Sequence, residues 1–245
     1  MQNAKFDKNM YMALLSDQCQ RYEEMIKSIE DMIKTRDKDI SQNERNLLII
    51  AYRNLINPKR LSLRTIMAYE TKEKKKETSM YLPYIREYRE KIENEITKIC
   101  QNLIFTIDND LLKKASETES KVFYIKIKGD FNRFMGEYAQ GDLREKVIKD
   151  GLSSYQEAYN LAKELPTFNL IFLGLCLNYS IFYYEVLNEK PNAMKIANEC
   201  IDKVNLNLNT VDQESDDFKK CLQIINLVQE NLNMWKSERE EVKKD

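Results

Sequence analysis

Residues 41–55, with the sequence SQNERNLLIIAYRNL, carry a complete helix start. Ser41 and Glu44 have the capping-box spacing, in which a serine hydroxyl and a glutamate carboxylate each accept from a backbone amide at the helix N-terminus. The apolar residues that follow share one helical face: Leu47, Leu48, Ala51 and Leu55. The stretch therefore predicts a long amphipathic helix that begins at Ser41.

Similar helix signals lie further along the chain. The same start pattern occurs at two other places: Ser116 with Glu119, and Thr210 with Gln213. Pro166 and Pro191 interrupt the second half, and the segments between the breaks are about 15 to 30 residues long, which is longer than a mean helix. We predict an all-α chain of nine antiparallel helices. Residues 124–130, YIKIKGD, alternate as a strand would, but no partner strand is visible and we interpret them as helical.

Composition excludes several classes of protein. The 245 residues include only 5 glycines and 4 prolines, too few for an all-β fold or a glycine-looped nucleotide site. Histidine is absent, which removes the commonest general base, zinc ligand and partner of a nucleophile. We expect no catalytic residues, no cofactor and no metal. An enzyme could still use carboxylate, lysine, tyrosine or cysteine side chains. We locate no arrangement of these residues in the sequence that would form a catalytic site.

Charge and cysteine usage limit the partners and the compartment. The net charge is −1, so the chain is not a polycation that binds nucleic acid. The longest apolar stretch, residues 170–177, is far shorter than the roughly 20 residues of a membrane helix, so we expect no membrane partner. The 5 cysteines form no C-x-x-C pair, which favours reduced thiols and a cytoplasmic or nuclear protein.

Basic residues recur at a spacing that allows a phosphate site. Arg53 and Arg60 lie seven residues apart, and Lys126 and Arg133 repeat that spacing, so each pair can project from one helical face. Asp130 lies at i+4 from Lys126, where an ion pair can hold the lysine. Two guanidinium groups and an ammonium brought together would bind a phosphate dianion. Spacing alone leaves the alternative open that these basic side chains simply face water and bind no phosphate.

Amide and apolar side chains share faces in the last third of the chain. Asn178 and Glu185 lie seven residues apart, and Leu227, Asn231 and Trp235 follow one another at steps of four. Such a stripe is often simply core. An amide among apolar residues is also what holds an extended peptide backbone in a groove.

Four stretches in order make the chain resemble the 14-3-3 proteins over nearly its whole length. They are RNLL at 45–48 with AYRN at 51–54, ESKVFY at 119–124 with KGD at 128–130, LCLNYS at 175–180 with FYYE at 182–185, and NL at 231–232 with Trp235. The resemblance implies nine antiparallel helices, a cup-shaped homodimer or heterodimer, and one groove per subunit for phosphoserine or phosphothreonine peptides. It also implies a binding protein without enzymatic activity, whose partners are phosphorylated client proteins.

The resemblance also implies an organisation of the chain. Residues 1–236 would form a single helical domain, with about 1–100 as the dimerisation half and about 42–235 lining the peptide groove. Residues 237–245 would be a short flexible tail. This tail is charge-balanced, so we expect it to compete weakly for a basic groove.

Individual groove residues follow from the resemblance. The phosphate-binding positions are Arg53, Arg60, Lys126, Arg133 and Phe134. The positions that hold the peptide backbone or support the rim are Asn178, Glu185, Asn231 and Trp235. The apolar wall is Leu177, Ile181, Ile224 and Leu227.

The implied dimer pairs the start of one chain with the third and fourth helices of its partner. The implied ion pairs between subunits are Arg21 with Glu95 and Glu24 with Lys91. The implied apolar seam consists of Leu15, Cys19, Ile66, Tyr69 and Tyr88. Ser62 follows a basic tripeptide at this seam, and its phosphorylation would add about −1.5 to −2 charges and split the dimer; an unmodified interface serine is the alternative.

Two departures from the family bear on phosphate binding. Phe134 stands where the family offers a tyrosine hydroxyl, and a hydrogen bond to a charged group contributes about 1.5–3 kcal/mol. We therefore expect phosphopeptide binding to be about tenfold weaker, unless a water or Lys126 replaces the missing donor. The alternative is that binding does not need the hydroxyl.

Pro58 lies between Arg53 and Arg60 in the sequence. It either changes the direction of the two arginine side chains or produces a mild kink that leaves the groove intact.

The leading hypothesis is an adaptor that clamps, masks or bridges phosphorylated clients. The alternative is a helical scaffold with the same fold and reduced or lost phosphate dependence.

Overall fold

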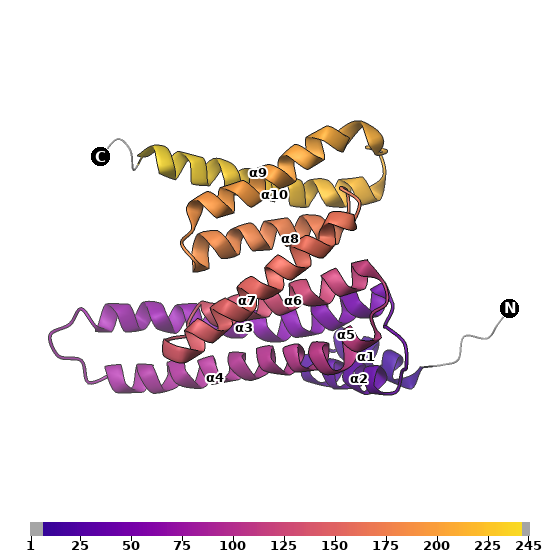
Figure 1. Cartoon of the computed structure of the whole chain (residues 1–245). Helices are drawn as coiled ribbons and strands as arrows, with labels where there is room; N and C mark the ends of the chain where they lie inside the picture. Colours follow the sequence, from indigo (N-terminus) through magenta and orange to yellow (C-terminus); the bar gives the residue numbers. More distant parts are fainter. Residues whose placement is uncertain (1–6, 242–245) are drawn as a thin grey trace. The chain divides into compact units, whose positions relative to one another are not determined.

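The computed structural model describes residues 7–241, and the side chains as far as Glu238. Within these residues the chain contains nine helices of 11 residues or more and no strand, which confirms the all-α prediction. It divides into two compact units, Met1–Ala115 and Ser116–Asp245 (Figure 1). The single domain expected over 1–236 stays a prediction.

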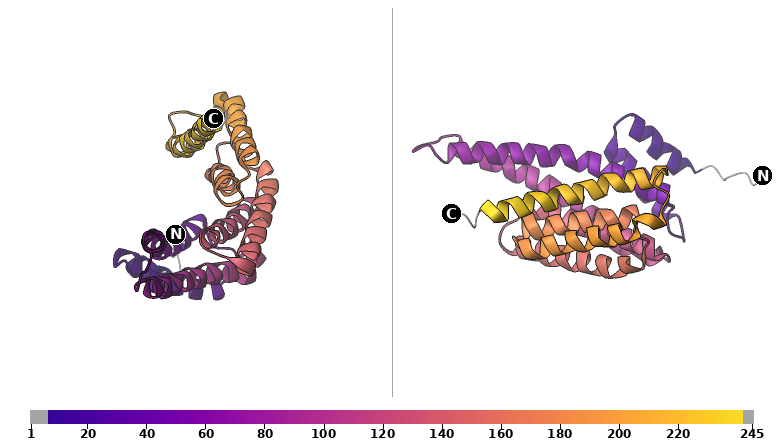
Figure 2. Two further views of the ribbon diagram at one scale, coloured as in Figure 1. Left: turned by 90° about the vertical axis from the view of Figure 1, so that its left-hand side faces the viewer. Right: turned by 90° about the horizontal axis from the view of Figure 1, so that it is seen from above.

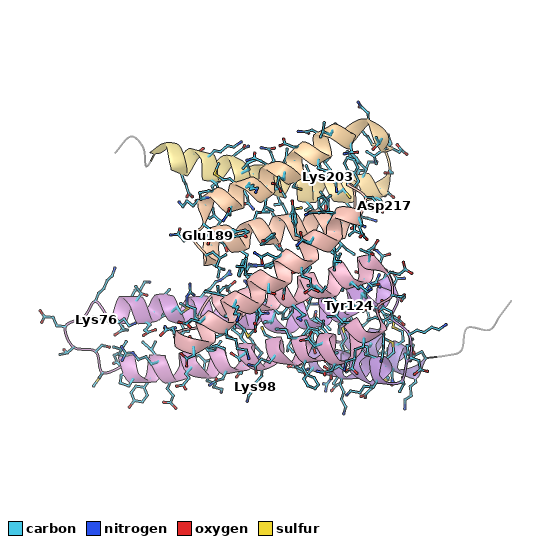
Figure 3. The ribbon with its side chains drawn as sticks, in the orientation of Figure 1. Lys76, Lys98, Tyr124, Glu189, Lys203 and Asp217 are labelled. Atoms are coloured by element: carbon cyan, nitrogen blue, oxygen red, sulfur yellow. The ribbon has the colours of Figure 1, made fainter. Side chains whose placement is uncertain are left out.

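The first unit is built from α1 to α5. Its elements are α1 (Lys8–Gln18), α2 (Tyr22–Lys34), α3 (Gln42–Glu73), α4 (Leu82–Thr106), the π-helix η1 (Ile107–Leu111) and α5 (Leu112–Lys114). Helices α3 and α4 lie side by side and are joined by the exposed connection that contains Lys76 (Figure 3). Helix α3 ends at Glu73, within the lysine-rich segment 71–79.

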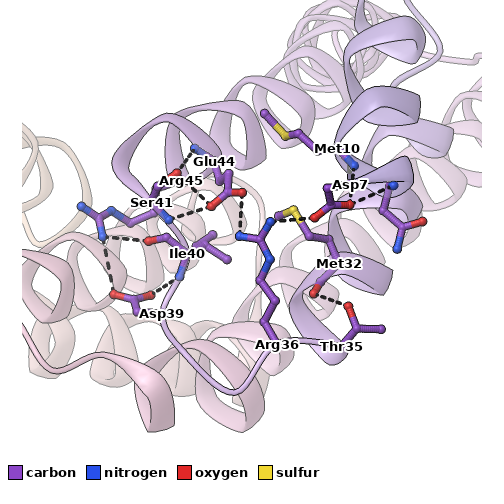
Figure 4. Close-up of polar contacts among 11 residues, drawn as sticks. Asp7, Met10, Met32, Thr35, Arg36, Asp39, Ile40, Ser41, Glu44 and Arg45 are labelled. Carbon is purple, nitrogen blue, oxygen red and sulfur yellow. Dashed lines mark hydrogen bonds and ion pairs between the residues drawn. The ribbon is translucent and has the colours of Figure 1, made fainter. Parts of the chain in front are cut away.

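The start of α3 has the predicted capping box. The Ser41 hydroxyl accepts the N–H of Glu44 at 3.4 Å, and the Glu44 carboxylate accepts the N–H of Ser41 at 2.7 Å. Arg36 extends this cap, because its guanidinium bonds Glu44 at 2.6 Å and Asp7 at 2.7 Å (Figure 4). Asp7 in turn caps α1 through the N–H groups of Asn9 and Met10. One arginine thus connects the starts of α1 and α3.

The second unit is built from α6 to α10. Its elements are α6 (Thr118–Gly136), α7 (Gly141–Leu161), the 3-10 helix η2 (Ala162–Glu164), α8 (Leu170–Ile181), the π-helix η3 (Phe182–Val186), α9 (Lys190–Asn207), the 3-10 helix η4 (Leu208–Thr210) and α10 (Asp216–Glu241). Helix α6 packs on α7, and α8, α9 and α10 pack on one another (Figure 2). The alternating stretch 124–130 lies inside α6, as predicted.

Two predicted helix starts are displaced. Helix α6 begins at Thr118, two residues after Ser116, and its N-cap Glu117 makes no side-chain cap bond. The start predicted at Thr210 is wrong, because Asp212 accepts the N–H of Glu214 at 3.0 Å and closes a separate turn. Helix α10 instead starts at Asp216, where the Ser215 hydroxyl accepts the N–H of Phe218 at 3.2 Å.

The C-terminal end of α10 overlaps the tail predicted over 237–245. The helix continues to Glu241, and residues 242–245 lie outside the described part. The flexible tail stays a prediction. None of the helices described combines the length and the apolar character that a bilayer-crossing segment needs.

Candidate functional site

A buried carboxylate organises the polar centre of the second unit. Asp130 on α6 is 1% exposed and accepts three hydrogen bonds, each of 2.8 Å: from Lys126 Nζ, from the Tyr155 hydroxyl on α7 and from Asn178 Nδ2 on α8. We call these four residues the Asp130 cluster. A buried charge requires this degree of compensation, because an unpaired ion away from water is strongly unfavourable.

The ion pair predicted from the i+4 spacing of Lys126 and Asp130 is present. Both residues are buried, and Lys126 Nζ lies 2.8 Å from the Asp130 carboxylate. The role of Lys126 in phosphate binding stays a prediction. Burial raises the pKa of Tyr155 well above its ordinary value, and the neighbouring Asp130 raises it further. Tyr155 therefore stays protonated and remains a donor to Asp130.

The cluster fixes which way the Asn178 side chain presents its amide. Its Nδ2 group donates to Asp130, so its carbonyl oxygen Oδ1 is directed elsewhere as an acceptor. Asn178 is half-buried in the last turn of α8, four residues before the π-helix η3 begins at Phe182. A fixed acceptor at the margin of an apolar surface is suited to a peptide backbone N–H.

Arg133 lies one turn after the cluster on α6. Burial alone would lower the pKa of Arg133, but interactions with Tyr155 and Asp130 outweigh it and the net pKa is raised, so the guanidinium stays charged. Its buried Nε has no hydrogen-bond partner among the described residues. Arg133 as a whole is half-buried, so a charged guanidinium is held beside the Asp130 cluster.

Phe134 is a packing residue in this structure. It is 6% exposed, its ring centroid lies 5.2 Å from that of Phe131, and the Arg133 guanidinium carbon lies 5.0 Å from its centroid. The ring supports Arg133 through a cation–π contact, but it supplies no hydroxyl donor.

The remaining basic candidates are on α3, in the first unit. Arg53 is exposed, and Arg60 is half-buried with Nη1 at 3.5 Å from Asn57 Oδ1. Helix α3 continues through Pro58 without interruption, and the Ser62 hydroxyl donates to the Pro58 carbonyl at 3.0 Å. The proline therefore does not break the helix that carries both arginines. That these arginines and Arg133 form one groove stays a prediction.

The predicted peptide wall belongs to the α8, α9 and α10 group. Leu177 and Ile181 pack against a buried core of Ala193, Ala197, Val228, Leu232 and Trp235. Ile224 and Asn231 are half-buried, whereas Leu227 and Glu185 are exposed. Trp235 is 2% exposed and its indole stacks on the Tyr184 ring at 4.6 Å.

The predicted dimer residues lie on the surface of the first unit. Eight are exposed, namely Leu15, Cys19, Arg21, Glu24, Ser62, Tyr69, Tyr88 and Lys91, and two are half-buried, Ile66 and Glu95. Within one chain Arg21 pairs with Glu24, and Glu95 pairs with Lys59 at 2.7 Å.

Sequence reasoning missed Tyr155, which completes the Asp130 cluster. Gly129 could have indicated that a large side chain lies against this part of α6, because a Cβ atom at this position would lie 2.8 Å from the Tyr155 ring. A glycine inside a helix often marks such a close approach. No group of three or more His, Cys, Asp or Glu side chains that could hold a metal ion occurs among the described residues.

Comparison with known proteins gives one consistent result. The family model of 14-3-3 proteins matches residues 12–236. The 14-3-3-like protein GF14-F of Oryza sativa subsp. japonica is 40% identical over 240 residues, covering 97% of this chain and 92% of that protein. A 14-3-3 protein homolog of Trichoderma harzianum is 41% identical over 233 residues, covering 95% and 88%. The 14-3-3-like protein A of Hordeum vulgare is 39% identical over 237 residues, covering 96% and 90%.

Proposed function

The chain belongs to the 14-3-3 protein family, and from this premise we propose that it binds phosphoserine or phosphothreonine peptides and clamps, masks or bridges the proteins that carry them. The proposed action is binding alone, without catalysis. A cytoplasmic location, with or without a nuclear pool, is part of the proposal.

The Asp130 cluster is the observation that carries this proposal. It holds the Asn178 amide with its Nδ2 committed to Asp130, and it lies beside Arg133, whose guanidinium is charged. A phosphopeptide offers both complementary groups: a dianion for the guanidinium and a backbone N–H for the amide oxygen. In the proposal Arg53 and Arg60 complete the phosphate grip, and Leu177, Ile181, Ile224 and Leu227 contact the apolar side chains of the peptide.

Dimerisation through the first unit is part of the same proposal. Exposed Tyr69, Tyr88 and Leu15 supply apolar area, and such area dominates the affinity because exposed ion pairs contribute only about 0–1 kcal/mol each. Arg21 and Glu95 already have partners within the chain, so the pairs between subunits require an exchange or sharing of partners. Two grooves per dimer would raise avidity about 10²–10⁴-fold for a client with two phosphosites.

The proposal is tested by fluorescence anisotropy with one labelled peptide, Arg-Ser-x-phosphoserine-x-Pro, and its unphosphorylated twin at physiological salt. We expect binding of the phosphorylated form only. Arg133→Lys and Arg60→Lys keep the charge and lose the planar fork, so each should weaken binding at least about tenfold. Lys149→Ala, an exposed position on α7, is the control. Equal binding of both peptides, or binding of neither by a folded chain, contradicts the proposal.

Phe134 favours one second candidate, a scaffold with reduced phosphate dependence. The buried ring offers no donor where the resemblance implies a hydroxyl. Phe134→Tyr should then raise phosphopeptide affinity by about tenfold. An unchanged affinity would show that the hydroxyl is dispensable, and the scaffold candidate would lose its main support.

A further inference from the structure

The C-terminal part of α10 is tied to the rest of the second unit by side chains outside the predicted groove. The Tyr184 hydroxyl, in the π-helix η3, donates to the Glu238 carboxylate on α10. The ammonium of Lys190, the first residue of α9, lies 3.4 Å from the same carboxylate. One acidic side chain of α10 therefore contacts two consecutive elements.

The same tyrosine also contacts Trp235. The Tyr184 and Trp235 rings stack with centroids 4.6 Å apart and an interplanar angle of 11°. Lys190 Nζ lies 5.0 Å from the Tyr184 centroid, which adds a cation–π contact. Tyr184 is thus held by its ring and by its hydroxyl, and both contacts involve α10.

The backbone between η3 and α9 places Lys190 near Tyr184. Asn188 has a positive φ of 55°, and the N–H of Glu189 donates to the carbonyl of Tyr183 at 2.8 Å. This tight turn returns the chain at once into α9. π-Helical turns often occur at functional positions, and here the turn also contains Glu185, a predicted peptide contact.

Helical geometry relates these contacts to the predicted groove. Trp235 lies three residues before Glu238 and Asn231 lies seven before it, so the three residues share one face of α10. A constraint on Glu238 therefore limits rotation and outward bending of the face that carries Asn231 and Trp235.

We propose that Tyr184, Lys190 and Glu238 form a latch that holds α10 against η3 and α9 and positions Asn231 and Trp235 for the peptide. The consequence for peptide affinity rests on the proposed function; the latch itself does not. Lys190 and Glu238 are positioning residues, because they act through Trp235 and Asn231. The side chains of Lys190 and Glu238 are 43% and 44% exposed, so we expect each single change to weaken peptide binding about threefold to fivefold.

Trp235 provides a readout that needs no peptide, because it is the only tryptophan of the chain. Acrylamide quenching of its fluorescence is compared between the wild type and three variants: Tyr184→Phe, Lys190→Met and Glu238→Ala. The matched control is Lys195→Met, which removes an exposed lysine of α9 that lies 4.0 Å from Glu199. The dissociation constant of the phosphopeptide is measured on the same five proteins.

We expect more efficient quenching and weaker peptide binding in the three variants, and neither change in the control. A sixth protein carries both Tyr184→Phe and Glu238→Ala, and its change in each measurement should be smaller than the sum of the two single changes, because both substitutions remove the same hydrogen bond. Unchanged quenching in the three variants overturns the latch. Increased quenching with an unchanged dissociation constant overturns its positioning role. If the wild type binds no phosphopeptide, the proposed function and the positioning role fail, and the quenching data alone confirm or overturn the latch.

Discussion

Asp130 in the second unit and Arg36 in the first are each the centre of a polar cluster, but Asp130 is 1% exposed, whereas the Arg36 side chain is 32% exposed. Asp130 accepts from three donors on three helices. Arg36 bonds Asp7 and Glu44 near the ends of two helices (Figure 4).

This difference in exposure determines how much each cluster depends on its charged partners. Water can replace a lost partner of Arg36, so its cluster contributes modestly to the stability of the first unit. Water cannot readily reach Asp130, so the loss of its charge leaves Lys126 as an uncompensated buried cation. We therefore expect the Asp130 cluster to hold the side chains of its members, including Asn178, in one orientation more firmly than the Arg36 cluster holds its own.

The largest expected effect is that of Asp130→Asn. It leaves the Lys126 ammonium buried without a counter-charge, and breaking such a pair is unfavourable by about 3–5 kcal/mol. Urea unfolding followed by Trp235 fluorescence reports the second unit. Asp150→Asn, an exposed carboxylate on α7, is the matched control and should change little. A loss below about 1 kcal/mol for Asp130→Asn would show that the cluster behaves like an exposed one.

Gly129→Ala should act on the same cluster through sterics. Its Cβ would lie 2.8 Å from the Tyr155 ring, and overpacking typically destabilises by about 1–3 kcal/mol. Gly174 on α8 is the control, because a Cβ there meets Lys126 only at an ordinary 3.6 Å. Gly174→Ala should therefore gain up to about 1 kcal/mol from helix propensity. Equal shifts of the urea midpoint in the two variants would contradict the close contact of Tyr155 with Gly129.

Arg36→Met should have the smallest effect, about 1 kcal/mol on the stability of the first unit. The pH dependence of this stability difference tests whether the contact of Arg36 with Asp7 causes it. The hydrogen bond from Arg36 lowers the pKa of Asp7 below its ordinary 3.8, so the ionised form is favoured in the folded chain. This contribution is complete above about pH 4 and is lost as the pH falls through the lowered pKa. Circular dichroism melts should therefore differ between wild type and variant at neutral pH and converge in acid; a constant difference would exclude Asp7 as the cause.

Local spacing predicted several of these features, and tertiary contacts explain the rest. The capping box of Ser41 and the ion pair of Lys126 with Asp130 depend on residues three or four apart, and both are present. Tyr155 lies 25 residues from Asp130, and Arg36 lies 29 from Asp7, so no periodic pattern could connect either pair. The helix predicted from Thr210 does not form there, because the Asp212 carboxylate accepts the N–H of Glu214 and closes a turn that competes with the helix. The roles of the groove residues followed only from the family resemblance.

A crystal structure of the chain with a bound phosphopeptide tests the central claim most directly. We expect the phosphate oxygens within hydrogen-bond distance of Arg133, Arg60 and Arg53. We expect Asn178 Oδ1 to accept a peptide N–H while Nδ2 still donates to Asp130. A peptide bound on another surface, or an Asn178 amide released from Asp130 in the complex, would contradict the account.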